Sequence, residues 1–178
     1  MSYYNFVLWL TGLPCSGKTT IAQNISELLQ KSGHKIKLLD GDDFRKNFCP
    51  HLGFSSKERD ENIKKAIIIA KKFFNEGNTV ICSFVSPYKH HREKAKEILG
   101  RDNFIEVFIN APLSVCERRD IKKMYKRARE GKISNFTGLD DIYELPTKPD
   151  IILYTDKENK EESVKKIINF LKKKKIEI

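Results

Sequence analysis

The chain has 178 residues, of which 34 are Lys or Arg and 24 are Asp or Glu, so its formal net charge at pH 7 is +10. Hydrophobic residues make up 39% and charged residues 33%, which is typical of one globular domain and excludes disordered and membrane-embedded classes. The apolar runs are far shorter than the roughly 20 residues that span a bilayer. Because the N-terminus lacks a basic region, we expect no signal peptide, no membrane partner and a cytoplasmic protein.

The positive charge fits either a polyanion such as nucleic acid or a small anionic substrate in a basic cleft, although single surface lysines are usually only solvated. No recognition helix or stacking platform is evident, so we expect no nucleic-acid partner. The cysteines stand singly, at Cys15, Cys49, Cys82 and Cys116. Their spacing excludes a zinc ribbon and a CxxC redox site.

Short apolar runs alternate with longer helical patterns along the chain. Strands are expected at residues 6–10, 35–39, 79–84, 104–109 and 151–153, and helices at 18–31, 56–75, 90–99, 113–119 and 161–174. This alternation predicts an α/β fold, with a parallel sheet covered by helices on both faces, in a single domain of residues 1–178. The stretch from about 120 to 148 is basic and lacks strand patterns, so we expect it to form a mobile lid.

Residues 12–19 match the P-loop pattern GxxxxGK[ST] and stand between an apolar strand and a helix. Such a loop holds phosphates on backbone N–H groups, while its lysine reaches the outer phosphates and its last hydroxyl binds Mg²⁺. We therefore expect ATP and Mg²⁺ as cofactors, with Lys18 catalytic and Thr19 a metal ligand. The expected ATP-binding residues of the loop are Gly12, Leu13, Pro14, Cys15, Ser16, Gly17, Lys18, Thr19 and Thr20.

Three carboxylates, Asp40, Asp42 and Asp43, follow the second expected strand, whereas the third expected strand ends without an acidic residue. The acid that faces the phosphates is therefore expected to come from Asp40 or Asp42. Such a carboxylate can hold a metal-bound water or accept a proton from the attacking hydroxyl. We place Asp42 first at the nucleophile, with Asp40 second and also a metal ligand. The alternative is a helix N-cap, which suits Asp42 or Asp43.

Six blocks of sequence carry a resemblance to one enzyme family: residues 12–20, 39–42, 52–55 with Arg59 and 61–63, 84–88, 116–120 and 132–138. Together they make the chain similar to the adenylyl-sulfate kinases from Trp9 to about Asp156. These P-loop kinases use ATP to phosphorylate the 3′-hydroxyl of adenosine 5′-phosphosulfate (adenylyl sulfate), giving 3′-phosphoadenylyl sulfate. The resemblance implies a P-loop NTPase-type fold, that activity in sulfate activation, and a homodimer.

The resemblance also implies a substrate site. Its residues would be Asp42, Arg45, Phe54, Arg59, Asn62, Val85, Ser86, Lys132, Ile133 and Phe136. Arg45 and Arg59 would hold the phosphosulfate, and Phe54 and Phe136 would stack on the adenine. Arg119, on the ATP side, and Lys132 would close over both nucleotides. As a lid residue, Phe136 is expected to contribute little to the core of the ligand-free protein.

Family annotation has treated the serine that matches Ser86 as a phosphoserine intermediate. No base for it is evident nearby in the sequence, and direct in-line transfer needs no covalent step, so we expect Ser86 to position the substrate. Two departures are visible. Pro14 and Cys15 replace Ser and Gly of the usual Gly-Leu-Ser-Gly-Ser-Gly-Lys, and residues 121–125 lack the Pro and Gly that usually follow the aspartate.

Two other functions remain open at this point. One is a sister kinase that acts on another nucleotide with an anionic 5′ group, such as a cytidine diphosphate derivative in surface-polysaccharide synthesis. The other is a nucleic-acid-binding ATPase, which the charge of +10 permits.

Overall fold

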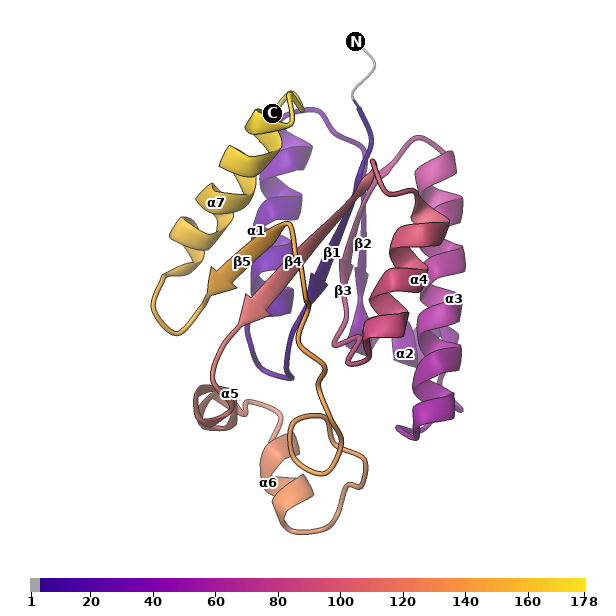
Figure 1. The fold of residues 1–178 in the computed structure, drawn as a ribbon, viewed down its shortest axis with the longest axis vertical. Helices are drawn as coiled ribbons and strands as arrows, with labels where there is room; N and C mark the ends of the chain where they lie inside the picture. The colour runs from indigo at the N-terminus through magenta and orange to yellow at the C-terminus, as the bar shows by residue number, and fades with distance from the viewer. Residues whose placement is uncertain (1–3) are drawn as a thin grey trace.

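The computed structural model describes residues 4–178. Its strands form one parallel sheet in the order β2-β3-β1-β4-β5 (Figure 1). They are β1 (Val7–Thr11), β2 (Ile36–Asp40), β3 (Thr79–Ser83), β4 (Phe104–Asn110) and β5 (Ile151–Tyr154). The helices are α1 (Lys18–Lys31), α2 (Gly41–Phe48), α3 (Ser56–Asn75), α4 (Lys89–Leu99), α5 (Leu113–Arg119), α6 (Met124–Arg129) and α7 (Lys160–Lys173).

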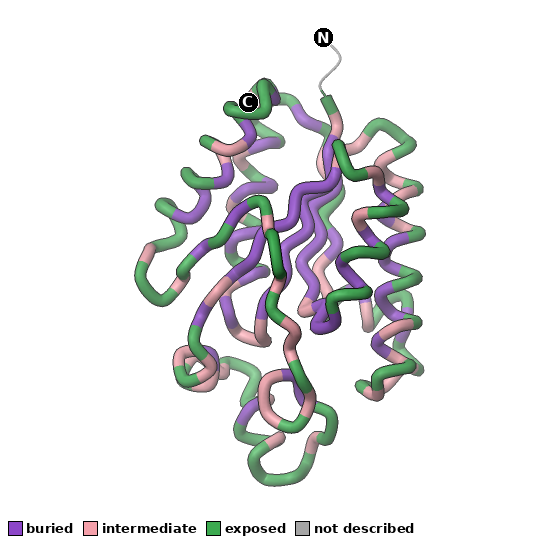
Figure 2. The backbone as a smooth tube through the Cα atoms, viewed as in Figure 1, coloured by how far each residue is buried: buried purple, intermediate pink, exposed green. Residues whose placement is uncertain are grey.

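The sheet is the middle of three layers, and its strands are the most continuously buried part of the chain (Figure 2). Every residue of the central strand β1 is buried, because a parallel strand carries helices on both faces. Leu8 and Leu10 pack into the core beneath α1 and α7. Val7 and Trp9 point the other way and pack into the core beneath α3 and α4. The alternation of side chains along one strand thus builds both cores.

The predicted fold class is confirmed, and each expected strand and helix is present with ends shifted by no more than two residues. Two helices were not predicted from the sequence, α2 and α6. In α2 only Phe44 is buried and in α6 only Tyr125. One buried side chain leaves no helical period to read, which is why both were missed.

The expected lid contains α6 and packs beneath α5 and the P-loop as a small separate cluster. Tyr125 and Phe136 are buried in that cluster, together with Cys116 of α5. The hydroxyl of Tyr125 donates to the carbonyl oxygen of Pro14 at 3.0 Å. The segment is therefore docked onto the nucleotide loop here, and its mobility stays a prediction.

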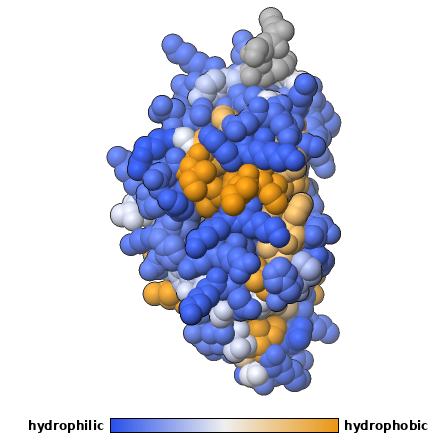
Figure 3. Space-filling model, turned by 90° about the vertical axis from the view of Figure 1, so that its right-hand side faces the viewer, coloured by the Kyte–Doolittle hydropathy of each residue, from blue (hydrophilic) through white to orange (hydrophobic). Residues whose placement is uncertain are grey.

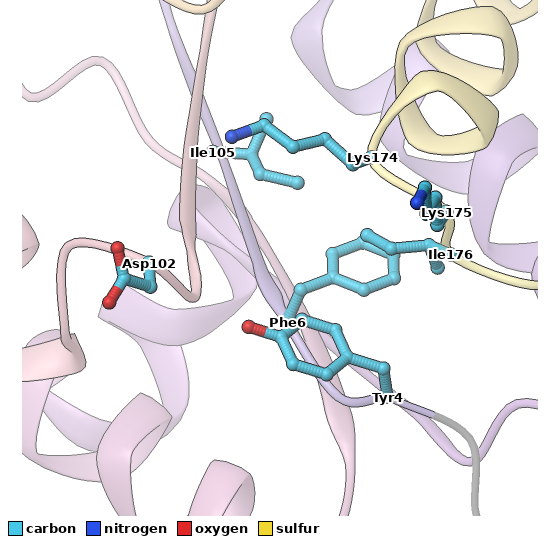
Figure 4. A pocket seen from close by; sticks show the side chains of 7 residues that line it. All are labelled: Tyr4, Phe6, Asp102, Ile105, Lys174, Lys175 and Ile176. Atoms are coloured by element: carbon cyan, nitrogen blue, oxygen red, sulfur yellow. The ribbon is translucent and has the colours of Figure 1, made fainter.

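A small pocket of about 180 Å³ opens at the amino-terminal edge of the sheet, where β1 and β4 begin. In Figure 4 Phe6 lies at its centre, and the Lys174 side chain reaches across toward Ile105. This pocket lies at the edge opposite the carboxyl ends of the strands, where ligands of such sheets bind. Among residues 4–178, no helix is both long and apolar enough to cross a bilayer.

Candidate active site

The P-loop joins β1 to α1 and has a conformation that few residues tolerate. Gly12 has a φ of 154°, and a Cβ at this position would lie 2.5 Å from the carbonyl oxygen of Ile109. Gly17 has a φ of 106° and Cys15 a φ of 59°. The left-handed region costs an L residue roughly 1–2 kcal/mol, which explains why glycine is usual where this chain has Cys15.

Lys18 is buried against this loop. Its Nζ donates to the carbonyl oxygens of Gly12 and Leu13 at 3.0 and 2.7 Å. Burial lowers the pKa of Lys18 to about 8. Ser16 Oγ, in the same loop, is buried and has no hydrogen-bond partner among the described residues. A desolvated cation and an unpaired hydroxyl in one loop fit a phosphate ligand, which would supply oxygens to both.

Asp40 lies at the carboxyl end of β2, beside the start of α1. Its Oδ2 accepts hydrogen bonds from Thr19 Oγ1 at 2.6 Å and from Ser83 Oγ at 3.1 Å. Its Oδ1 accepts from the Asp42 N–H at 3.1 Å, so Asp40 caps α2. The alternative left open from the sequence, a cap at Asp42 or Asp43, is therefore not what the structure shows. A carboxylate beside a hydroxyl offers the hard oxygen ligands that Mg²⁺ prefers, and so the predicted pair Thr19 and Asp40 fits that ion.

Asp42, in the first turn of α2, has an exposed carboxylate that forms an ion pair with Lys122 of the expected lid. These residues are 80 positions apart in the chain. This ion pair raises the pKa of Lys122. Asp42 therefore stands where the lid meets the body of the protein, two residues after the predicted metal ligand Asp40.

The two predicted anion-binding arginines both lie close to one aromatic ring, that of Phe54. The guanidinium carbon of Arg45 is 4.7 Å from the centroid of Phe54, and that of Arg59 is 5.6 Å from it. Arg45 Nη1 also donates to the carbonyl oxygens of Leu52 and Gly53. Burial, and next the charge of Arg59, lower the pKa of Arg45. Two neighbouring cations that repel each other suit a ligand with several negative charges.

Arg59 is also held by the lid. Its Nε is 3.3 Å from Asp141 Oδ2, and both side chains are largely buried. The hydroxyl of Tyr88 donates to the same carboxylate at 3.1 Å. Asn62, one turn further along α3, is buried, and its Oδ1 has no partner among the described residues. Arg59 and Asn62 therefore lie on one side of α3, as predicted.

Ser86 is buried in a chain of hydrogen bonds behind the site. Trp9 Nε1 donates to Ser86 Oγ at 3.1 Å, and Ser86 donates to Thr11 Oγ1 at 3.1 Å. Thr11 in turn donates to the Val85 carbonyl oxygen at 2.8 Å. The backbone at Ser86 has a positive φ of 37°. Its hydroxyl thus has both a donor and an acceptor, and it connects Trp9 of β1 to the loop after β3.

The lid residues of the predicted site behave differently from one another. Phe136 is only 6% exposed, and its ring packs edge to face on Tyr125, with centroids 4.8 Å apart. The expectation that it contributes little to packing is wrong. Ile133 is half-buried against the same cluster, whereas Lys132 is exposed and pairs with Glu130 at 2.7 Å.

Arg119 ends α5 beside the nucleotide loop. It donates to the carbonyl oxygen of Ser16 at 3.3 Å and to Thr155 Oγ1 at 3.2 Å. Thr155 Oγ1 donates to the same Ser16 carbonyl at 2.7 Å. The predicted ATP-side arginine is thus in contact with the P-loop backbone.

Among the partners of the site that were not predicted are Lys122, Asp141 and Thr155, which contact the predicted residues Asp42, Arg59 and Arg119. Tyr88, also not predicted, reaches the site through Asp141. These contacts join residues far apart in the sequence, so no local pattern marks them. The many charged residues within 120–148 indicated that this segment could form ion pairs with the rest of the protein. They did not indicate that Lys122 would pair with Asp42 or Asp141 with Arg59.

Comparison with known proteins gives the family. The model of the adenylylsulphate kinase family matches residues 4–154. The chain belongs to this family. An adenylyl-sulfate kinase from Halothermothrix orenii is 47% identical over 167 residues, which are 94% of this chain and 89% of that relative. One from Pseudomonas aeruginosa is 46% identical over 93% of this chain and 84% of the relative.

Solved structures agree with this assignment to the adenylylsulphate kinases. An APS kinase from Mycobacterium tuberculosis, solved in complex with AMPPNP and APS, is 36% identical with a TM-score of 0.89. The match covers 94% of this chain and 98% of that one. A shikimate kinase from Aquifex aeolicus, 21% identical with a TM-score of 0.57, shares the fold alone. The predicted family resemblance and the P-loop kinase fold are confirmed.

Proposed function

We propose that this chain transfers the γ-phosphoryl group of ATP to the 3′-hydroxyl of adenylyl sulfate. The observation that carries the proposal is the arrangement of two nucleotide sites at one edge of the sheet. The P-loop with buried Lys18 would form one of them. Arg45 and Arg59, which both lie close to the ring of Phe54, would form the other. In support, a relative with 36% identity binds AMPPNP and APS.

On the ATP side, the loop N–H groups and Lys18 would bind the phosphates, and Arg119 would fix the backbone of Ser16. Two of the three Nζ donors of Lys18 now bind the carbonyl oxygens of Gly12 and Leu13, and they would exchange these partners for phosphate oxygens. Exchanging two neutral carbonyl groups for charged phosphate oxygens is favourable for a desolvated ammonium.

Thr19 and Asp40 would hold Mg²⁺. When bound, this ion neutralises charge that develops on the transferring phosphoryl group. The Thr19 hydroxyl now donates a hydrogen bond to Asp40. With the ion bound, this O–H would rotate away from Asp40, so that the hydroxyl oxygen and the carboxylate oxygen both face the ion.

On the acceptor side, Arg45 and Arg59 would bind the phosphosulfate, with Asn62 donating a further hydrogen bond. Asp42 would accept the proton of the 3′-hydroxyl as it attacks. Lys122 pairs with Asp42 now, so this pair would open for the carboxylate to reach the hydroxyl. Ser86 and Val85 would shape the wall beside the hydroxyl, and Ile133, Phe136 and Lys132 would complete the site from the lid.

No separate observation favours a cytidine nucleotide or nucleic acid as the acceptor. The test is a coupled assay of ADP release with adenylyl sulfate, a cytidine diphosphate derivative and random DNA, each as the sole added acceptor or activator. We expect turnover with adenylyl sulfate alone, and a product that NMR identifies as 3′-phosphorylated. Turnover with the cytidine nucleotide at equal or higher kcat/KM would contradict the proposal.

We also infer a homodimer in the cytoplasm, where ATP is abundant. The face formed by α3 and α4 carries an apolar patch (Figure 3), and these helices expose Ile68 and Ile98. Large exposed apolar patches often mark protein interfaces. Light scattering after size exclusion should give twice the mass of 20.7 kDa, and Ile68→Lys should reduce it if this face is the interface.

A further inference from the structure

Three side chains with metal-binding atoms meet between α3 and α4, outside the proposed nucleotide sites. They are Asp60 of α3 and the adjacent His90 and His91 of α4. One ligand atom from each lies within 4.8 Å of the others. Asp60 Oδ1 is 2.9 Å from Nε2 of His90 and 2.7 Å from Nε2 of His91. None of the three belongs to the sequence blocks that carry the family resemblance.

We propose that Asp60, His90 and His91 form a binding site for a divalent transition-metal ion of the zinc type. Imidazole nitrogen suits Zn²⁺ and its neighbours in the series, whereas Mg²⁺ takes oxygen ligands. The site is therefore chemically distinct from the pair Thr19 and Asp40. Three protein ligands leave the fourth position of a tetrahedral ion to water.

Two of the three ligand separations lie close to those that a metal requires, and the third, between ring nitrogens of the two histidines, is at most 4.8 Å. Zinc bonds of about 2.0–2.2 Å in a tetrahedral arrangement place neighbouring ligand atoms roughly 3.3–3.5 Å apart. The present separations of 2.9 and 2.7 Å from Asp60 to the two rings need to open by only about half an ångström. His90 is an exposed side chain at the helix start, so it can make this adjustment without disturbing the core.

The buried ring of His91 is in a state that permits ligation. Its Nδ1 has no hydrogen-bond partner among the described residues. Because no neighbouring group among these residues donates a hydrogen bond to Nδ1, this nitrogen can carry the ring proton while Nε2 binds a metal.

Arg92, which follows His91 in the chain, is engaged elsewhere. Arg92 donates to the carbonyl oxygens of Ser86 and Glu144 and pairs with Glu106 at 3.0 Å. It therefore does not neutralise Asp60. A bound ion would tie α3 to α4, which pack side by side on one face of the sheet (Figure 1).

The bound ion would lie next to Arg59, one of the two arginines proposed to bind the substrate. Asp60 directly follows Arg59, and the ring of His90 stacks on Tyr88 with centroids 5.5 Å apart. Tyr88 in turn donates to Asp141, the partner of Arg59. The consequence is a structural ion that fixes the start of both helices without touching the transferred phosphoryl group.

The experiment titrates the ligand-free protein with Co²⁺ and with Zn²⁺, in excess Mg²⁺, and follows the visible cobalt spectrum and Tm. We expect one ion per chain, a four- or five-coordinate cobalt spectrum without a thiolate charge-transfer band, and a higher Tm. At zinc about a hundred times Kd, the rise should be about 5–11 °C for a chain of this size.

His90→Gln and Asp60→Asn should each raise the metal Kd at least tenfold, because even residues that only orient a ligand contribute about 10–100-fold. Both sites are exposed or half-exposed, so these variants should fold. His51→Gln is the matched control, since His51 faces only Glu61, at 4.0 Å, and should leave Kd unchanged.

Three results would overturn the proposal: no binding at millimolar metal, equal binding by wild type and both ligand variants, or a thiolate band that places the ion on a cysteine. In the first case Asp60 only accepts hydrogen bonds from the two histidines. None of these results depends on turnover, so failure of the proposed kinase activity is distinguished separately.

Discussion

The hydroxyl of Thr19 donates to the carboxylate of Asp40 at 2.6 Å, although 21 positions separate them. Thr19 lies in the first turn of α1 after the P-loop, and Asp40 ends β2 at the same edge of the sheet. Asp40 also accepts from Ser83 at the end of β3. The carboxylate is thus fixed from two directions and faces the loop, which makes it the better placed of the two predicted acids for a metal.

Asp40→Asn should therefore change the magnesium dependence of turnover. The amide oxygen can still cap α2 at the Asp42 N–H, so Tm should fall little. Loss of the charge should raise the Mg²⁺ concentration for half-maximal rate more than about tenfold, because Mg²⁺ is held in such sites by only one or two carboxylates. Initial rates at fixed ATP and varied Mg²⁺ measure this. An unchanged magnesium curve would remove Asp40 from the metal site.

Asp42→Asn should act on kcat at saturating Mg²⁺. General-base catalysis contributes typically about 10²–10⁴-fold, so we expect a loss of that size with little change in KM for ATP. Asp43→Asn is the matched control, because Asp43 is an exposed neighbour paired only with Lys46 at 3.9 Å. Equal kcat values for the two variants would show that Asp42 has no role at the nucleophile.

Lys18 predicts a pH dependence for ATP binding. Its pKa is about 8 in the ligand-free protein because of burial, and phosphates would raise it by favouring the ammonium form. Below pH 8 the lysine is charged in both states. Above pH 8 binding must take up a proton, so the Kd for ATP should rise by up to about tenfold per pH unit.

Calorimetry in two buffers of different ionisation enthalpy detects this proton uptake. Lys18→Ala should abolish the uptake at pH 8–9 and retain less than about a tenth of the wild-type kcat. Proton uptake of the same size in Lys18→Ala would assign it to another group.

Features that depend on residues adjacent in the chain could be predicted from the sequence, whereas features that depend on contacts between distant residues could not. The strand at 6–10 and the P-loop after it could be predicted because the apolar run, the glycines and Lys18 are contiguous. The cap at Asp40 could not be placed, since all three carboxylates suit an N-cap and only the start of α2 chooses among them. The burial of Phe136 could not be predicted either, because its partner Tyr125 lies on a helix too short to show a period.

Ser86→Ala tests whether that serine is a nucleophile or a positioning residue. The change leaves the Trp9 N–H buried without an acceptor, which costs about 1–3 kcal/mol, or a fall in Tm of roughly 2–12 °C. With direct transfer the variant keeps measurable turnover. Quenched-flow mass spectrometry of the wild type should find no phosphoserine at residue 86. Phosphoserine that forms and decays as fast as steady-state turnover would refute direct transfer.

Phe136→Leu distinguishes two possible roles of the Phe136 ring, which are packing against Tyr125 and stacking on the adenine of adenylyl sulfate. A leucine retains most of the apolar contact with Tyr125 but has no aromatic face for the adenine. Phe136→Ala, by contrast, should cost up to about 3–5 kcal/mol in packing and is the wrong probe. If Phe136 stacks on adenylyl sulfate, the leucine variant should lose about 1–3 kcal/mol of acceptor binding. That loss corresponds to a Kd higher by roughly 5–150-fold.

Phe54→Leu is the companion variant, because Phe54 is 38% exposed and lies close to both arginines, so it should show a similar loss of acceptor affinity. The Kd for ATP should stay within about twofold in both variants, since the phosphates are bound by the loop. Titration calorimetry with each nucleotide, alongside one melting curve, provides all these values. An acceptor Kd that is unchanged in Phe136→Leu but raised in Phe54→Leu would leave the lid phenylalanine with a packing role alone, since the docked cluster already buries its ring against Tyr125.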